Sequence, residues 1–214
     1  MDKLKKHDDE RIAFNRDFVH MLVNTRALLD GGSMFLKEIP ESEASDLVAQ
    51  FLNGAARDLA RSIAAMEIYN LPDYFHLLTV DKSSSLAATT SNDFKAIIGS
   101  LLNVSSKITF VDASKDWQGD LAVQKGVLEG IMICYCASLS DNSDVLNSIE
   151  CRYSWTGADL ELTFTALNGE TSLFLDKDSI YMSALVKNLE LLKKLNIDIN
   201  FEPPLKVSLP RVVK

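Results

Sequence analysis

Two long helical patterns, separated by a short break at a proline, constrain the fold of this chain more than any other feature. The first runs from Asp9 to Glu38 and the second from Glu41 to Asn70. The break contains Pro40, which a continuing helix would not accommodate. Two helices joined by so few residues run antiparallel, side by side. Residues 1–78 are therefore expected to form a long helical hairpin.

Each helix of this hairpin carries an apolar stripe. At about 100° per residue, the first stripe crosses Gly31 and Gly32, so we expect one helix that tolerates both glycines. The first stripe contains Phe14, Phe18, Leu22, Leu29, Leu36 and Ile39. The second contains Val48, Phe51, Ala55, Leu59, Ile63 and Met66. Two helices cannot cover both stripes, whereas a homodimer would complete a four-helix bundle.

The pattern changes after residues 79–92, a polar stretch rich in serine and threonine that is typical of a connection. Residues 92–214 are expected to form a second, mixed α/β part, which makes the fold class α+β. Helices are predicted over residues 93–103, 120–139 and 179–195. Strands are predicted over residues 107–112, 147–154, 158–166, 196–204 and 205–210, with a hairpin around the turn "WTGAD". Helices over one face of a mixed sheet are the simplest arrangement of these elements.

Composition and charge limit the classes of function. The chain has 214 residues and a formal net charge of −8 at pH 7, whereas a nucleic-acid-binding protein needs a basic face. The first residues, "MDKLKKHDDER", have no apolar core and do not form a signal peptide. The apolar run "GIMICYCASL" is too short to span a bilayer. We therefore expect a cytoplasmic protein with protein partners and no membrane or nucleic-acid partner.

Three cysteines, Cys134, Cys136 and Cys151, show no zinc-ligand spacing. Cys134 and Cys136 are two residues apart on a predicted helix, so they point to different sides of it. All three are expected to be reduced, buried thiols, and no metal is expected.

A helical hairpin with a histidine on its first helix, followed by an α/β part, resembles the core of a sensor histidine kinase. The nucleotide-binding boxes of that core are not visible. The helix that would carry the asparagine box reads "VLEGIMICYCASL" and has no asparagine to help hold magnesium. After the strand hairpin, where a glycine-rich loop belongs, there is only "TALNGE" with the turn dipeptide Asn168-Gly169.

This combination resembles the bacterial histidine phosphotransferases of the ChpT type, over roughly Arg11 to Leu209. The stretch "FVHMLVNTRALLDGGSMFLKEI" is similar to the histidine helix of that family, and "SALVKNLELLKKLNIDINFEPPLKVSLP" is similar to its last helix and strands. The resemblance implies a homodimer that has lost nucleotide binding. It implies relay of a phosphoryl group between receiver domains of a hybrid histidine kinase and of response regulators. No cofactor is then expected in this chain, because the receiver supplies Mg²⁺.

His20 is the candidate phosphoacceptor. On a helical wheel it lies roughly 150° from the centre of the first apolar stripe, so its ring is expected to face solvent. An exposed, neutral imidazole can attack an aspartyl phosphate. Asp17 and Asn24, one turn before and after, are candidate supporting residues. The family usually follows its histidine with an acidic residue, whereas this chain has Met21.

Other interpretations remain open at this point. The chain could be a non-catalytic interaction module of histidine-kinase-like fold, or a divergent ATP-binding kinase core, and nucleotide binding would separate these. Arg57 and Arg61 are either solvated or placed to offset phosphate charge. His7 lies in a charged stretch and His76 among aromatic residues, so neither is favoured as a site.

Overall fold

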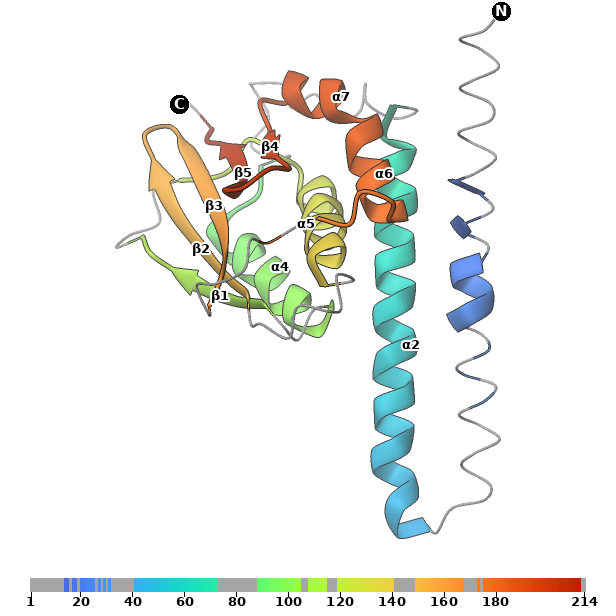
Figure 1. Cartoon of the computed structure of the whole chain (residues 1–214). Helices are drawn as coiled ribbons and strands as arrows, with labels where there is room; N and C mark the ends of the chain where they lie inside the picture. Colours follow the sequence, from blue (N-terminus) through green and yellow to red (C-terminus); the bar gives the residue numbers. More distant parts are fainter. Residues whose placement is uncertain are drawn as a thin grey trace, which may run out of the picture.

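The computed structural model describes residues 14, 15, 17, 18, 20–25, 27, 29, 31, 41–72, 88–104, 108–114, 119–140, 149–167, 173 and 175–212. Figure 1 shows an α/β part beside a long helix, α2, and the helical positions of residues 14–31 on the far side of α2. We call these described helical positions the N-terminal helical segment, and the word hairpin by itself refers only to this segment together with α2; the predicted connection between them lies outside the described residues. The rest of the predicted helix Asp9–Glu38 lies outside the described residues.

The elements follow in the order α2 (Glu41–Tyr69), α4 (Ser91–Val104), β1 (Ile108–Asp112), α5 (Lys125–Ser140), β2 (Ile149–Thr156), β3 (Asp159–Ala166), α6 (Ile180–Lys187), α7 (Leu189–Lys194), β4 (Asp198–Asn200) and β5 (Leu205–Pro210). The strands form a five-stranded sheet in the order β1-β2-β3-β5-β4. β1 pairs in parallel with β2, and the other described pairs are antiparallel. The predicted mixed α+β fold is confirmed.

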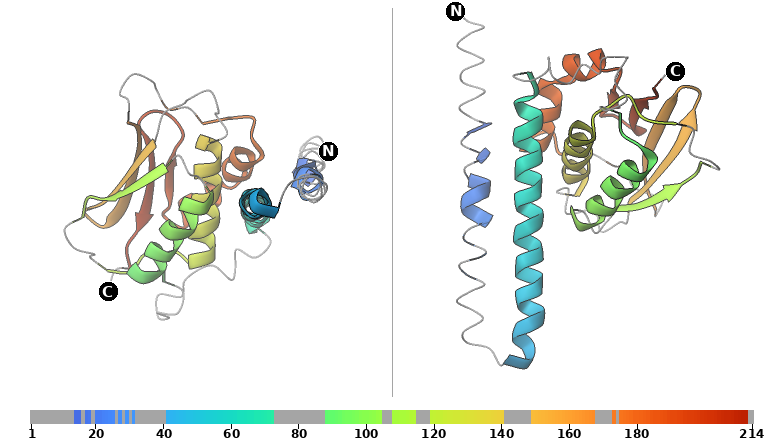
Figure 2. Two further views of the ribbon diagram at one scale, coloured as in Figure 1. Left: turned by 90° about the horizontal axis from the view of Figure 1, so that it is seen from below. Right: turned by 180° about the vertical axis from the view of Figure 1, so that it is seen from behind.

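Helices cover one face of this sheet, and the hairpin lies beyond them (Figure 2). The strands alternate accordingly, because neighbouring side chains point to opposite faces. Residues Ile149, Cys151, Tyr153, Leu160, Leu162, Phe164, Leu205, Val207 and Leu209 are buried. The opposite face carries ion pairs of Arg152 with Glu150 and of Lys206 with Glu161, the second at 2.9 Å.

α5 is the central helix of the molecule. Every residue from Gly130 to Leu139 is buried, which explains why its sequence shows an apolar run rather than a stripe. α5 packs closely on α2 at Gly130, where an added Cβ would lie 3.0 Å from Ile68 Cδ1. Residues of the hairpin, among them Phe14 and Ile68, therefore share one apolar core with the α/β part.

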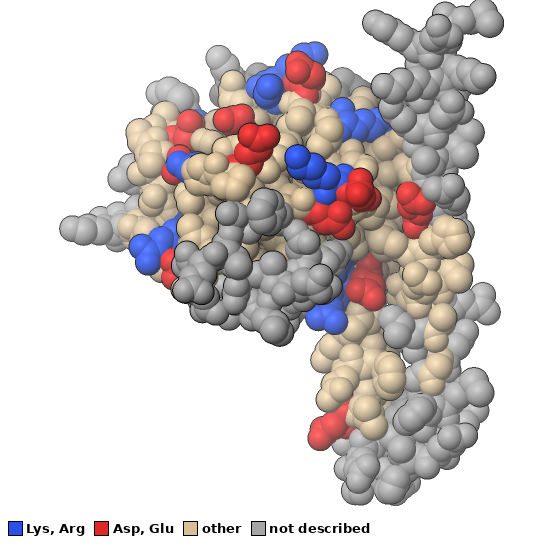
Figure 3. Space-filling model, in the orientation of Figure 1, with Lys and Arg blue, Asp and Glu red and all other residues tan. Residues whose placement is uncertain are grey.

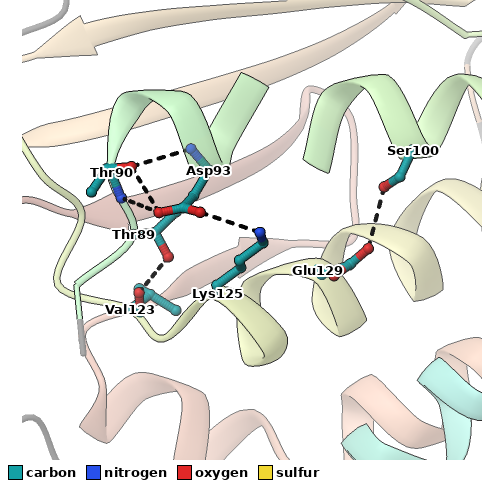
Figure 4. A network of polar contacts seen from close by, with 7 residues as sticks. All are labelled: Thr89, Thr90, Asp93, Ser100, Val123, Lys125 and Glu129. Carbon is teal, nitrogen blue, oxygen red and sulfur yellow. Dashed lines mark hydrogen bonds and ion pairs between the residues drawn. The ribbon is translucent and has the colours of Figure 1, made fainter. Parts of the chain in front are cut away.

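A polar network fixes the start of α4 against α5 (Figure 4). Thr90 and Asp93 form a reciprocal cap, in which Asp93 N donates to Thr90 Oγ1 at 3.2 Å and Thr90 N donates to Asp93 Oδ2 at 3.3 Å. Lys125 pairs with Asp93 at 3.2 Å. Hydrogen bonds from Thr90, followed by those from Lys125, hold the pKa of Asp93 below its usual value.

Two predicted helices differ from the observed ones. The predicted helix 120–139 begins at Lys125, because Leu121 forms β-bridges with Thr89 and Arg211 instead. The predicted helix 179–195 is two helices, α6 and α7, interrupted at Asn188. The second break has a tertiary cause, since the buried Asn188 amide donates to Ile68 O at 2.7 Å and Ala184 O at 3.1 Å.

The last turn of α2 is held by α6. The first helical residue described, Phe14, stacks on Tyr69 with ring centroids 3.6 Å apart. Lys187, the last residue of α6, places its Nζ 3.2 Å from the centre of the same Tyr69 ring. Together with Asn188, these contacts fix the hairpin to the α/β part. Among the described residues, no helix combines the length and apolar content that a membrane-spanning segment requires.

Replacing Asn188 with alanine is expected to lower the free energy of unfolding by about 1–3 kcal/mol, because the carbonyl of Ile68 loses its buried donor. Chemical denaturation would measure this change. Asn92→Ala, at an exposed helical position, is the matched control and should have little effect. Equal stability of the two variants would show that the Asn188 contact does not hold α6 on α2.

Candidate functional site

His20 is helical and exposed, as the sequence predicted. Asp17 and Asn24 are also helical and exposed. On the wheel these two lie between His20 and the buried face of the N-terminal helical segment, within about 60° of His20. The three side chains therefore share one flank of the helix.

The buried face of this segment differs from the predicted stripe. Phe14 and Thr25 are buried, and Phe18 and Met21 pack against the core. Leu22 and Leu29, which the sequence assigned to the stripe, are 37% and 41% exposed. The centre of the buried face is roughly 130° from His20, and the exposed leucines lie on the side away from it. The difference arises because α6 packs over one flank of the hairpin and contacts Met21 through Tyr181.

A cleft of about 390 Å³ lies on the His20 side of the hairpin. Its walls come from the N-terminal helical segment, from α2 and from the turn that starts α6. It is lined by Met21, Asn24, Thr25, Asp58, Arg61, Ser62, Asp176, Ser179, Ile180 and Tyr181. Asn24 therefore lies on the same flank of the helix as His20 and also lines the cleft. Arg61 is one of the lining residues, whereas Arg57 is not.

The turn that forms the α6 wall is internally hydrogen-bonded. Ser179 Oγ donates to Asp176 O at 2.9 Å and accepts from Met182 N at 3.2 Å, which makes Ser179 the N-cap of α6. Asp178 N donates to Asp176 Oδ1 at 3.0 Å. This wall is therefore held by hydrogen bonds within the turn itself.

Met21 points into this cleft. Its sulfur lies 3.6 Å from the hydroxyl of Tyr181 and 4.0 Å from that of Ser62. The single hydroxyl proton of Ser62 is taken by Asp58 O at 2.7 Å. Tyr181 is therefore the hydroxyl that donates to the thioether. Met21 occupies the position where the ChpT-type family usually has an acidic residue. Its side chain points toward α6 and lies about 100° around the helix from His20.

α5, the helix that would carry a nucleotide box, is buried in the core. Cys134, Cys136 and Cys151 are free and buried, as predicted. Burial raises the pKa of Cys136 to about 12 and the pKa of Cys134 still further. Ser138, a polar residue of this buried stretch, donates to Cys134 O at 2.9 Å. Its hydroxyl is thus used within the helix.

Some predicted residues cannot be placed. His7, His76 and the turn Asn168-Gly169 lie outside the described residues. Within the described parts of the chain, no group of three or more histidine, cysteine, aspartate or glutamate side chains is arranged to hold a metal ion. On the face seen in Figure 3, acidic and basic side chains are interspersed over the α/β part. Uncharged atoms predominate along the described lower half of the hairpin.

Sequence reasoning missed Tyr181, Ser179 and Asp176. Each is more than 150 positions from His20 in the chain, and no motif marks them. Only the packing of α6 on α2 brings them to the His20 side of the hairpin.

Comparisons with solved structures identify the fold. A bacterial phosphotransferase is similar over 94% of this chain and 95% of its own, with a TM-score of 0.50 at 12% identity. The histidine kinase AdeS of Acinetobacter baumannii matches over 89% of this chain and 97% of its own, with a TM-score of 0.48 at 13% identity. No family model matches the sequence, and no curated protein matches it.

At such low identity the likeness is one of fold. The chain has the fold of the bacterial phosphotransferase over nearly its whole length. The resemblance to a histidine-kinase-like phosphotransferase that the sequence indicated is therefore confirmed for the fold.

Proposed function

We propose that this protein is a histidine phosphotransferase of a two-component phosphorelay, in which His20 carries the phosphoryl group between receiver-domain aspartates. The observation that supports this most is the exposed His20 on a helical hairpin, within the fold of a bacterial phosphotransferase. The partners are receiver domains of a hybrid histidine kinase and of response regulators.

The proposed reaction needs little from this chain beyond placement of the imidazole. A ring nitrogen of His20 attacks the phosphorus of an aspartyl phosphate in line with the leaving carboxylate. The new P–N bond forms as the P–O bond to the aspartate breaks, and the carboxylate leaves. Mg²⁺ held by the receiver offsets the charge. Transfer onward reverses these steps.

Asp17 and Asn24 are proposed to support His20. The Asp17 carboxylate can accept from a ring N–H of His20, which would keep the other nitrogen free to attack. Asn24 can accept or donate beside the phosphoryl group. Both are exposed on the flank of His20, so a docked receiver would meet all three together.

The same architecture favours phosphotransfer over autokinase activity. α5 has its side chains packed between the sheet and α2. α6 is attached to the last turn of α2 through Asn188 and Lys187. A kinase must instead bring its nucleotide domain to its own histidine. An α/β part attached in this way, which we propose does not bind nucleotide, suits a relay protein.

The hairpin is proposed to dimerise through an exposed apolar face. On the single chain, Leu52, Leu59, Ile63 and Met66 of α2 are 37–55% exposed. The Phe14–Tyr69 and Met21–Ser62 contacts pair the N-terminal helical segment with α2 in antiparallel directions. In this arrangement Leu22 and Leu29 lie on the same face of the pair as the exposed apolar residues of α2. His20 and the cleft are on the opposite face. A four-helix bundle would cover the apolar face and leave His20 accessible.

Replacing His20 with alanine is expected to abolish phosphoryl acceptance and to change the free energy of unfolding by no more than about 0.5 kcal/mol, because the side chain is exposed. Purified receiver domains, phosphorylated with acetyl phosphate, would be incubated with the protein. Transfer would appear as acid-labile, base-stable label. His76→Ala is the control and should keep the label. Wild-type labelling of the His20→Ala variant would refute the assignment.

The double change Leu59→Glu and Ile63→Glu is expected to convert a wild-type dimer into folded monomers. Two unpaired charges within a bundle interface cost several kcal/mol, while in the single chain these positions are 44% and 43% exposed. Sedimentation would give the mass and circular dichroism the fold. Asn53→Glu, an exposed position on another side of α2, should remain dimeric. A monomeric wild type at micromolar concentration would contradict the proposal.

Titration of the protein with Mg-ATP is expected to release no heat, since the face of α5 where an asparagine box belongs is packed in the core. Calorimetry on the full chain is the measurement. Micromolar binding, about −8 kcal/mol, would instead favour the divergent kinase. A receiver domain added as a control ligand distinguishes an inactive preparation from the absence of nucleotide binding.

A further inference from the structure

Met21 combines two features that bear on its chemistry. Its sulfur lines an open cleft and accepts a hydrogen bond from the hydroxyl of Tyr181 at 3.6 Å. The other methionines that the structure describes differ from it. Met132 and Met182 are buried, and Met66 is on the exposed apolar face of α2.

We propose that Met21 is a site of oxidation to methionine sulfoxide by peroxides. The sulfur lone pair attacks one oxygen of hydrogen peroxide, the O–O bond breaks, and an S–O bond forms. Sulfur loses two electrons, the proton on the transferred oxygen passes to the other peroxide oxygen, and that oxygen leaves as water. The oxidant reaches the sulfur through the cleft, whereas packing protects Met132 and Met182.

The side chains around Met21 can form stronger hydrogen bonds with the sulfoxide product than with the thioether. A thioether is a weak acceptor, while a sulfoxide oxygen is a strong one. Tyr181 already points its hydroxyl at this sulfur. Ser62 lies 4.0 Å from the sulfur and can turn its proton from Asp58 O to a new oxygen. Oxidation thereby converts a weak contact between the N-terminal helical segment and α6 into an ordinary hydrogen bond.

The position of Met21 connects this chemistry to phosphotransfer, a step that rests on the proposed function. His20 is the preceding residue, and Asn24 of the same helix also lines the cleft. The stronger hydrogen bond from Tyr181 to the oxidised side chain fixes this turn of the helix to α6 and so changes the position of the adjacent His20. Displacement of a reacting group by about 1 Å can cost roughly 10²-fold in rate. Oxidised protein is therefore expected to accept phosphate about tenfold more slowly.

Limited treatment of the full chain with hydrogen peroxide, followed by peptide mass mapping, tests the site without any phosphotransfer. Met21 is expected to gain an oxygen while Met132 and Met182 remain unmodified. Oxidised protein that carries both Tyr181→Phe and Ser62→Ala, in which neither hydroxyl can donate to the new oxygen, is expected to melt about 2–4 °C below its reduced form, the scale of one unsatisfied hydrogen bond in a chain of this length. Oxidised wild type should not show this loss. Oxidation of Met21 no faster than of the buried methionines would overturn the proposal.

The functional consequence is tested by comparing treated with untreated protein for wild type and for Met21→Leu, which has a similar volume but cannot be oxidised. The rate of phosphoryl acceptance by treated protein, divided by the rate for untreated protein, should fall below one for wild type and stay near one for Met21→Leu. An equal fall in both proteins would place the damage elsewhere and refute the link to His20. If untreated wild type accepts no phosphate, the proposed function fails, while mass mapping still decides the oxidation site.

Discussion

The contact between the last turns of α2 and the helices α5 and α6 is the constraint on which the rest of the structure depends. Gly130 lets α5 approach Ile68 so closely that an added Cβ would lie 3.0 Å from it. The carbonyl of Ile68 in turn accepts from the buried amide of Asn188. This contact joins the hairpin and the sheet part into one core and holds the end of α6, at Asn188, on the last turn of α2.

The position of α6 divides the hairpin into two unlike faces. The turn from Asp176 to Ser179 and the ring of Tyr181 cover one flank, where they form the cleft beside Met21 and Asn24. The other flank keeps Leu59 and Ile63 exposed. A histidine on the first face remains accessible when the second is covered by another chain. The arrangement is therefore compatible with the proposed relay, in which receiver domains dock at one histidine.

Much of the fold followed from local pattern. The strand hairpin around Gly157 and the two-residue alternation of β2 and β3 are visible because burial of one sheet face repeats every second residue. α2 was predicted within one residue of its observed end at Tyr69. The break at Asn188 was not predictable, because its cause is a carbonyl 120 residues away in the chain. The same holds for Leu121, which leaves a helical pattern to bridge Thr89 and Arg211.

For the site, the sequence by itself determined that His20 lies on a helix and away from its apolar stripe, since helical periodicity alone sets that angle. The sequence also determined that Met21 stands where the ChpT-type family usually has an acidic residue, and that α5 contains no asparagine. Only the tertiary structure decided what Met21 faces and which leucines of the stripe stay exposed. The physical reason is that a helical wheel gives the direction of a side chain, while the identity of its neighbour depends on how distant segments such as α6 pack.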